Sequence, residues 1–512
     1  MYRFTCSVLP IVVILAACSE STGSAGPVAS VTLAVTPAAL AVTDQAAIDV
    51  EAFDGSGAPT QWSDYSSAAS HASYSTNPSG IVTASGTLVT AVGKGTTTLT
   101  ATIEGKSASV TIVVAGLAHR SAITASESWL AADGPHYVRG QLHVGGTSPV
   151  TLTIGEGAQL RFDLGAGLVF DKAGAVLHAV GTAAAPIVMT ADSALANVDH
   201  PVQGLWGGIL ISNSQSQVEH VLMSDCGGGG YLIRPLYGCL VVTGLSGDSP
   251  RPVVSDLIIE NYIATALTAL VRGGLGAGSA NITITGGPAT LGAAPIIISP
   301  NEVGTLPAST TLTGNGRNEI DVLTLPPSNI TNEQYDVGDS TISVSQTWPN
   351  FGVNYVVLSA IWVGGSGSPV LTLVPGDTLR FDHTALFIGR NGAGGLVAAG
   401  TAQAPILFTS NYTDKFAASW KGIDFASGVL ALSKLDHVVM EAGDTPVPDP
   451  PYGMVMVEVN GLDQLITNST IRISYWCGIA RHWAAGGSNT DYTLPALGNS
   501  FSANTYGDQC GP

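Results

Sequence analysis

The sequence predicts an all-β protein with two unlike regions, and three observations support this expectation. Glycine is abundant at 62 residues and stands among many threonine, serine and valine residues, which favours strands and tight turns over helices. Short apolar segments recur along the chain and are separated by Gly, Asn, Asp or Ser. In the C-terminal region, a stretch of roughly 200 residues occurs twice, which is typical of repeat architectures.

The first seventeen residues have the layout of a secretory signal. Arg3 is followed by an apolar run from Val8 to Ala17, which only Pro10 interrupts, and small residues end the run. At about ten residues this run is too short to span a bilayer, which needs about twenty. We therefore expect residues 1–17 to be a signal that is removed rather than a retained helix.

The end of this signal, Leu15-Ala16-Ala17-Cys18, closely resembles the lipobox of bacterial lipoproteins. The resemblance implies cleavage before Cys18 and acylation of its thiol, with residues 18–28 as a polar, flexible tether. The alternative is an ordinary signal peptide with a chance cysteine at its end. By resemblance to enterobacterial sorting, Ser19 after the cysteine favours the outer membrane. The expected partner is thus a membrane, bound through lipid on Cys18, and the expected location is the outer membrane or cell surface.

The chain is acidic and sparsely charged. Its formal net charge is −19, and only 11% of its residues are Asp, Glu, Lys or Arg. An acidic surface repels phosphate backbones, so nucleic-acid binding is not expected.

Four cysteines remain beyond Cys18, namely Cys226, Cys239, Cys477 and Cys510. In an oxidising compartment four cysteines indicate two disulfides, which can be connected in three ways. We favour Cys226 with Cys239 and Cys477 with Cys510, because each pair lies within one half of the duplication. Free buried thiols are the alternative.

Residues 29–115 are expected to form a β-sandwich. Seven short segments with turn residues between them fall in this stretch, which is the pattern of such a fold. The expected strands cover residues 30–35, 47–53, 60–63, 80–83, 88–92, 98–102 and 108–114.

Three phrases of this region, Gln61-Trp62-Ser63, the segment from Gly86 to Gly95 and the segment from Thr98 to Thr102, resemble the bacterial immunoglobulin-like group 2 domain. That family implies a spacer or adhesive module rather than an enzyme. We expect Trp62 to be a core residue between the two sheets rather than a ligand platform.

Residues 118–512 contain the duplication, with halves at about 118–325 and 329–512. Leu160-Arg161-Phe162-Asp163 returns as Leu379-Arg380-Phe381-Asp382, and Trp206-Gly207-Gly208-Ile209 returns as Trp420-Lys421-Gly422-Ile423. Within each half, short strands without intervening helices predict stacked coils, in which each rung buries its inner face on the next. A pair of antiparallel sandwiches is the competing architecture.

The phrases Leu-Thr-Ile-x-x-Gly-x-x-Leu-Arg-Phe, Gly-Thr-x-x-x-Pro-Ile-x-x-Thr and Trp-x-Gly-Ile resemble right-handed parallel β-helix proteins of the pectate-lyase-like superfamily. They look especially like its non-catalytic surface proteins. The predicted fold class is therefore all-β, with an immunoglobulin-like sandwich followed by a long, internally duplicated right-handed parallel β-helix.

The search for chemistry gives no catalytic residue. Asn489-Thr490-Asp491 matches one phrase of the polygalacturonase-like hydrolases, but the sequence has no Asp-Asp pair and no Gly-His-Gly. General acid catalysis on a glycoside needs a second carboxyl group. No cysteine or histidine spacing fits zinc, and no cofactor is expected. Calcium on the acidic surface is left as an alternative, although nothing in the spacing requires it.

Some polar and aromatic residues occur at equivalent positions in both halves. An active site is normally single, so residues that are repeated in this way more often support the geometry of the rungs. By strand period, Arg161 is expected to pair with Asp163 and Arg380 with Asp382. His220 and His437 are expected in solvated or hydrogen-bonded turns, and Trp206 and Trp420 at a corner of the coil.

The sequence thus predicts a non-enzymatic cell-surface lipoprotein that displays a β-helix for adhesion or for binding carbohydrate or another envelope component. The first alternative is a polysaccharide lyase or glycoside hydrolase with a divergent site. The second is a purely structural envelope protein.

Overall fold

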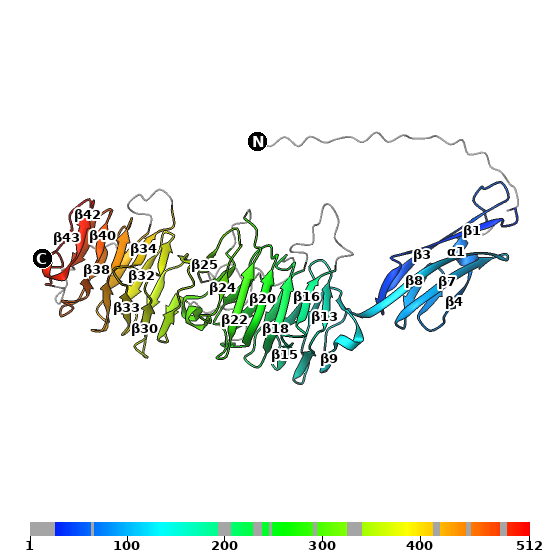
Figure 1. Cartoon of the computed structure of the whole chain (residues 1–512), viewed down its shortest axis with the longest axis horizontal. Helices are drawn as coiled ribbons and strands as arrows, with labels where there is room; N and C mark the ends of the chain where they lie inside the picture. Colours follow the sequence, from blue (N-terminus) through cyan, green and yellow to red (C-terminus); the bar gives the residue numbers. More distant parts are fainter. Residues whose placement is uncertain are drawn as a thin grey trace. The chain divides into compact units, whose positions relative to one another are not determined.

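A computed structural model describes residues 26–62, 66–192, 206–228, 238–244, 248–289, 294–324, 340–412, 420–446, 452–481 and 489–511. The signal segment and Cys18 lie outside the described residues. The chain divides into two compact units, Met1–Ala115 and Gly116–Pro512, which are described separately (Figure 1). No helix in these described ranges is both long and apolar enough to cross a membrane.

The first unit consists of two antiparallel sheets around one core. In β3 every second residue from Ala46 to Ala52 is buried, so one face of the strand is apolar. One sheet has the order β1 (Ser30–Thr36), β3 (Gln45–Phe53), β6 (Leu88–Ala91), β5 (Val82–Ser85). The other contains β4 (Ser73–Asn77), β7 (Gly95–Ile103), β8 (Lys106–His119) and β2 (Ala39–Val42), and the helix α1 spans Ala68–His71.

One expected strand of this unit is wrong. Residues 60–62 form no strand, and β4 at Ser73–Asn77, which the sequence pattern did not indicate, pairs with β7 instead. Trp62 is half-buried, packs against the core and stacks on His71 with ring centroids 4.5 Å apart. The immunoglobulin-like assignment of this unit stays a prediction.

The second unit is a parallel β-helix, which confirms this part of the fold expected from the sequence. The described strands of this unit pair in parallel, so the competing antiparallel sandwiches are wrong. Thirteen strands form the longest wall, which we call wall A. In order they are β11 (Gln141–His143), β14 (Gly167–Phe170), β17 (Gly208–Ile211), β19 (Leu240–Thr243), β21 (Leu267–Leu270), β23 (Ile296–Ile298), β25 (Glu319–Val322), β28 (Asn354–Val357), β31 (Thr378–Phe381), β34 (Ile406–Ser410), β37 (Val438–Glu441), β40 (Thr470–Arg472) and β42 (Ser500–Ser502).

Two further walls complete each half. In the first half, wall B continues from the last residues of β8 through β10 (His136–Val138), β13 (Gln159–Phe162), β16 (Ile187–Ala191), β18 (Gln217–Ser224), β20 (Val253–Glu260), β22 (Ala280–Thr285) and β24 (Thr311–Leu312). Wall C contains β9 (Glu127–Trp129), β12 (Val150–Ile154), β15 (Ala175–Val180) and the first residues of β18 and β20.

The second half has walls D and E. Wall D consists of β26 (Thr341–Ile342), β29 (Ile361–Val363), β32 (Ala385–Ile388), β35 (Gly422–Phe425), β38 (Gly453–Val457), β41 (Cys477–Arg481) and β43 (Gln509–Cys510). Wall E consists of β27 (Gln346–Trp348), β30 (Val370–Leu373), β33 (Gly395–Ala399), β36 (Lys434–Asp436) and β39 (Ile466–Thr467). Short 3-10 helices lie at η1 (Ala131–Asp133), η3 (Pro300–Thr305) and η6 (Pro495–Leu497).

One core joins the rungs of both halves. In β13, Leu160 and Phe162 point inward while Arg161 is half-exposed, and this alternation repeats in the strands stacked on it. The repeated tryptophans are fully buried, with Trp206 stacked on Phe162 at 4.0 Å and Trp420 on Phe381 at 4.6 Å. Their ring nitrogens donate to the carbonyls of Ser224 and Glu441.

The two halves are stacked out of phase by one wall. The duplication makes β13 equivalent to β31, yet β13 lies in wall B while β31 lies in wall A. The junction is the pairing of β25 with β28, in which Ile320 lies opposite Tyr355. Wall A therefore passes from the second strand of each rung in the first half to the first strand of each rung in the second half.

Candidate functional site

The two disulfides of the structure are Cys226 with Cys239 and Cys477 with Cys510, the pairs favoured from the sequence. Their Cα atoms are 5.1 and 5.9 Å apart, which suits a disulfide. The two bridges are not equivalent, however. Cys226 and Cys239 close a loop within one rung, whereas Cys477 in β41 and Cys510 in β43 link neighbouring rungs.

The expected pairing within the strands, Arg161 with Asp163 and Arg380 with Asp382, is wrong. Strand β13 ends at Phe162, so Asp163 lies in the following turn, where period two no longer places it beside Arg161. Asp163 instead accepts from Arg139.

The same holds in the second half. Arg380 of β31 binds Glu319 of β25, two strands away along wall A, and Asp382 accepts from the Tyr412 hydroxyl at 2.8 Å.

The repeated histidines lie at bends of the coil: His220 is within β18, where the strand passes from wall C to wall B, rather than in a turn, and His437 lies between β36 and β37. His220 and His437 have left-handed backbones with φ of 48° and 51°. Nδ1 of His437 lies 3.0 Å from the carboxylate of Asp436, and Nε2 of His220 lies 3.7 Å from that of Asp256. These side chains hold bends in the rungs.

Asp491, the carboxylate of the phrase that matches the hydrolases, is engaged within its own turn. Its carboxylate accepts from the backbone and hydroxyl of Thr493, at 3.0 and 2.6 Å. These hydrogen bonds, the hydroxyl one first, lower the pKa of Asp491, which keeps the group ionised. An ionised carboxylate that is already engaged is poorly suited to donate a proton to a leaving group.

A group of aromatic side chains lies on the turns that follow β37, β40 and β42. Trp476 stacks on Tyr506 with ring centroids 4.8 Å apart, and Tyr452 lies 4.7 Å away from the same indole. Tyr475 meets Trp476 edge-on at 5.2 Å. Tyr475 is 44% exposed and Tyr506 60% exposed, while Tyr452 and Trp476 are half-buried. We call these four residues the aromatic corner.

The backbone holds this corner firmly. The amide of Cys477 donates to the carbonyl of Tyr452, and that of Tyr506 to the carbonyl of Trp476. The Cys477–Cys510 disulfide lies directly beside it, with both sulfur atoms within 3.7 Å of the Tyr506 carbonyl oxygen. The rings are thus positioned by hydrogen bonds between rungs and by a covalent link.

Three residues with a left-handed backbone conformation lie in the segments that contain the aromatic corner. Ala442, Ile473 and Ala503 have φ of 61°, 59° and 56° on three successive rungs. Such a conformation is unfavourable for alanine and more so for β-branched isoleucine. Stored backbone strain of this kind occurs often at binding and catalytic sites.

Polar groups flank the aromatic corner. The ammonium of Lys421 lies 2.7 Å from the carboxylate of Asp444. Nearby, Asn504 donates to the carboxylate of Asp508 at 3.3 Å and accepts from the amide of Ser474. The surroundings therefore combine two exposed tyrosine side chains with hydrogen-bond donors and acceptors and with charged groups of both signs.

The sequence reasoning missed this corner. A usable signal was present, because Tyr475 and Trp476 directly precede Cys477, and Tyr506 comes four residues before Cys510. Aromatic residues adjacent to a rigidly bridged cysteine pair are candidates for a presented surface. Only the stacking of the rungs, however, brings Tyr452 to the same place.

Comparisons with known proteins add little. No protein-family model matches the chain, and no curated protein matches it. Among solved structures, a mutant tailspike protein of E. coli bacteriophage HK620, in complex with a pentasaccharide, matches with 8% identity and a TM-score of 0.21. The match covers 77% of this chain and 71% of the tailspike chain. Likeness at this level gives no information about what this chain binds.

Proposed function

We propose that this chain is a carbohydrate-binding protein of the bacterial cell surface that holds glycans on the aromatic corner without cleaving them. The observation that carries the proposal is the stack of Trp476 and Tyr506, with Tyr475 exposed beside it.

Sugar chemistry fits this surface. A pyranose ring presents a face of C–H bonds that packs on an aromatic face, and its hydroxyls need hydrogen-bond partners around that contact. Tyrosine hydroxyls both donate and accept, and Asp444, Asp508 and Asn504 supply further polar atoms. An exposed cluster of rigid aromatic side chains is also costly unless a partner covers it.

Binding is favoured over cleavage by how the carboxylates of the β-helix are used. Arg139 joins Asp163 and Asp192, and Arg390 joins Asp424 and Glu458, each guanidinium lying between two carboxylates. These groups stabilise neighbouring rungs through charge-assisted hydrogen bonds.

A second candidate function, glycoside hydrolysis, has one observation in its favour. Glu319 and Asp321 project from the same side of β25, and both bind Arg317. Burial raises the pKa of Asp321 against the opposing effect of Arg317, as the acid of a hydrolase requires.

The location is part of the proposal. Lipid on Cys18 would tether residues 18–28 and the two units to the envelope, and the acidic chain would itself be repelled by anionic lipid. Replacing Cys18 with alanine is expected to release the protein from the membrane fraction of the producing cells. A variant that stays with the membranes would contradict the lipoprotein assignment.

The binding test uses the purified full chain on a glycan array, followed by titration calorimetry with the strongest short oligosaccharide. Trp476→Ala is expected to weaken binding by about tenfold or more, and Tyr506→Ala by somewhat less. Ile258→Ala is the matched control, since Ile258 on wall B is 43% exposed and apolar. Thermal unfolding of each variant shows that it is folded.

Three results would change the proposal. Unaltered affinity in folded Trp476→Ala would show that the glycan binds elsewhere, and the absence of any bound glycan would remove the function. New reducing ends that vanish in Glu319→Gln would establish the hydrolase.

A further inference from the structure

The first half of the β-helix has a pocket of about 380 Å³ at the bends where wall C passes into wall B. It crosses three rungs, and its lining includes Pro186, His220, Leu222, Asp256, Ile258 and Asn281. These six residues lie in the described part of the second unit. We call this site the bend pocket.

One side of the bend pocket is polar because the bends themselves carry polar residues. His220, Asp256 and Asn281 have left-handed backbones, with φ of 48°, 49° and 53°. They stand at equivalent positions of β18, β20 and β22, so they form a ladder along the coil. Histidine, aspartate and asparagine adopt this conformation more readily than most other residues.

Asp256 is the acid of this ladder. Nδ2 of Asn281 donates to its Oδ1 at 2.9 Å, whereas Nε2 of His220 lies 3.7 Å from its Oδ2. The second distance is longer than a hydrogen bond, so Oδ2 can accept one from a ligand. The side chain of Asp256 is 37% exposed, which leaves it within reach of such a ligand.

The floor of the bend pocket is apolar. Leu222 lies opposite Ile258 in the register of β18 and β20, and both side chains point outward because their neighbours in the strands point into the core. The turn that contains Pro186 lies beside this floor, since the amide of Gly181 donates to the carbonyl of Glu219 at 2.9 Å. A carboxylate thus stands at the margin of an outward-facing apolar surface.

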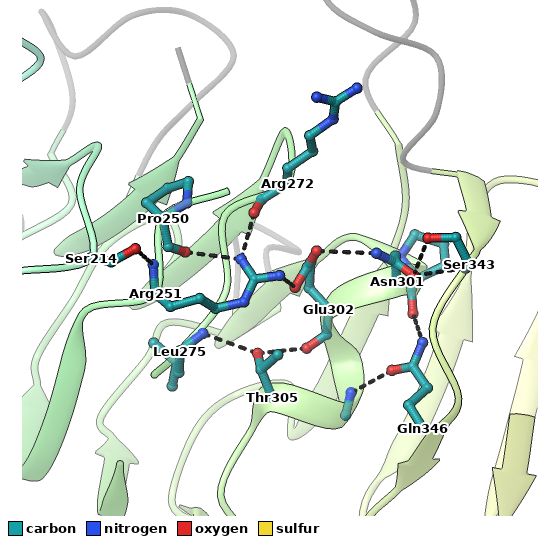
Figure 2. Close-up of polar contacts among 12 residues, drawn as sticks. Ser214, Pro250, Arg251, Arg272, Leu275, Asn301, Glu302, Thr305, Ser343 and Gln346 are labelled. Carbon is teal, nitrogen blue, oxygen red and sulfur yellow. Dashed lines mark hydrogen bonds and ion pairs between the residues drawn. The ribbon is translucent and has the colours of Figure 1, made fainter. Parts of the chain in front are cut away.

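The rungs that carry the pocket are joined to one another at the segments before β18, β20 and β22 (Figure 2). The hydroxyl of Ser214 accepts from the amide of Arg251 at 2.9 Å. The guanidinium of Arg251 donates to the carbonyl of Arg272 at 2.7 Å and lies 2.6 Å from the carboxylate of Glu302 in η3. Because each of the three segments contributes to these contacts, the bends that follow are held in place.

The helix η3 is in turn bonded to the first strands of the second half. Gln346 accepts from the amide of Gly304 at 2.7 Å and donates to the carbonyl of Pro300 at 3.0 Å. Figure 2 shows these contacts on both sides of η3. A pocket on rungs that are fixed in this way is formed before a ligand arrives, as small-molecule sites usually are.

The carboxylate and the apolar floor are specific to the first half. Asn468 stands where the first half has Asp256, and Thr470 stands where it has Ile258. Asn468 keeps the left-handed backbone, with φ of 49°. The bend is therefore repeated while the acid and the apolar side chain are not, which favours a role in binding over a role in rung geometry.

We propose that the bend pocket binds a small organic cation, in which an amine is joined to a compact apolar group. The ammonium donates to Oδ2 of Asp256 in a charge-assisted hydrogen bond, and the apolar group covers Leu222 and Ile258. A cavity of about 150 Å³ holds a benzene ring, so the pocket has room for an aromatic ring and a short aliphatic arm. The net charge of −19 attracts cations to the protein. This site is independent of the proposed glycan binding.

The test compares three probes of similar size, phenethylamine, phenethyl alcohol and hydrocinnamate, which are cationic, neutral and anionic. Ligand-observed NMR titrations of the full chain measure their affinities. Phenethylamine is expected to bind about tenfold more tightly than the alcohol, and hydrocinnamate is expected not to bind.

Two variants test the residues of the pocket. Asp256→Asn is expected to lower the affinity for phenethylamine by about tenfold, to that of the alcohol. Ile258→Ala is expected to lower the affinity for the amine and the alcohol alike, by about fivefold. Thr470→Ala, at the equivalent position of the second half, is the matched control and is expected to change no affinity. Thermal unfolding shows that each variant is folded.

Four results would overturn the bend pocket. They are no binding of phenethylamine, equal or tighter binding of the alcohol or of hydrocinnamate, an unchanged affinity for phenethylamine in folded Ile258→Ala, and the same in folded Asp256→Asn. Trp476→Ala separates this site from the aromatic corner, because an aromatic surface also attracts cations. Loss of phenethylamine binding in that variant alone would place the amine on the aromatic corner and contradict the inference. Glycan binding enters none of these outcomes, so the proposed function stands or fails separately.

Discussion

The two halves of the β-helix have equivalent strands and buried tryptophans, yet they differ at the turns and at a few core positions. Where the second half has Tyr475 and Trp476, the first half has Ile263 and Ala264. At two equivalent turns, the residue with positive φ is Asp225 or Asn261 in the first half and Ala442 or Ile473 in the second.

The difference indicates that the inward residues that stack the rungs and the turn residues at the surface can change independently of each other. Inward residues are constrained by the rungs above and below, because a change in volume leaves a cavity or an overlap. Turn residues face solvent, so their side chains can vary as long as each residue can adopt the backbone conformation of its turn. Asn and Asp meet the left-handed conformation at low cost, so at these two turns the first half is less strained than the second.

The core also differs at the first rungs. Ala158 of the first half corresponds to Asp377 of the second, and both are buried. Asp377 accepts from the amide of Val374 at 2.8 Å, and burial raises the pKa of its carboxyl to about 7. The second half thus contains a buried acid that titrates near neutrality.

The largest expected effect is at the junction between the halves. Arg251→Ala leaves the buried carboxylate of Glu302 without its guanidinium, and is expected to lower the free energy of unfolding by about 3–5 kcal/mol. Denaturant unfolding measures this loss. Lys172→Ala is the control, because this lysine is exposed and its pair with Asp171 contributes at most about 1 kcal/mol. Equal effects of the two substitutions would show that η3 does not hold the halves together.

The second prediction concerns how the buried carboxyl of Asp377, which stands where the first half has Ala158, makes the stability of the protein depend on pH. The folded chain holds this proton up to about pH 7, whereas the carboxyl ordinarily releases it near 3.8. The contribution of this group to stability is therefore present below pH 3.8 and is lost as pH rises through about 7.

Asp377→Asn keeps an acceptor for Val374 and removes the charge. It is expected to stabilise the protein at pH 8 by on the order of 3 kcal/mol and to change little at pH 4. Calorimetric melting of both proteins at the two pH values measures this. A stabilisation that is the same at both values would contradict the assigned pKa.

The smallest expected effect comes from exchanging turn residues between the halves. Ile473→Asn relieves a strained left-handed residue and is expected to stabilise by about 1 kcal/mol, whereas Asn261→Ile is expected to destabilise by about the same amount or more. Thermal unfolding of both variants measures these changes. If Ile473→Asn were destabilising, the isoleucine would be held there by packing rather than tolerated.

Much of the fold could be predicted from local sequence patterns. Alternation in segments such as Leu160-Arg161-Phe162 predicts a strand with one buried face, because side chains on a strand alternate. The returning Trp-x-Gly-Ile phrase predicts equivalent rungs, and its glycines at 208 and 422 are needed because a side chain there would collide with the carbonyls of Gly238 and Met454. The disulfide pairs followed from the position of the cysteines within the halves.

Sequence by itself thus determined the strand content, the parallel rungs and the duplication, since these follow from short-range periodicity and from self-similarity. The tertiary structure alone decided the phase of the halves, because that depends on η3, on its contacts to Arg251 and Gln346, and on the register of β25 against β28. It also decided the partner of Asp163. Strand β13 ends at Phe162, so Asp163 lies in the following turn and accepts from Arg139. The tertiary structure also decided the aromatic corner, because Tyr452, Trp476 and Tyr506 meet only when three rungs are stacked.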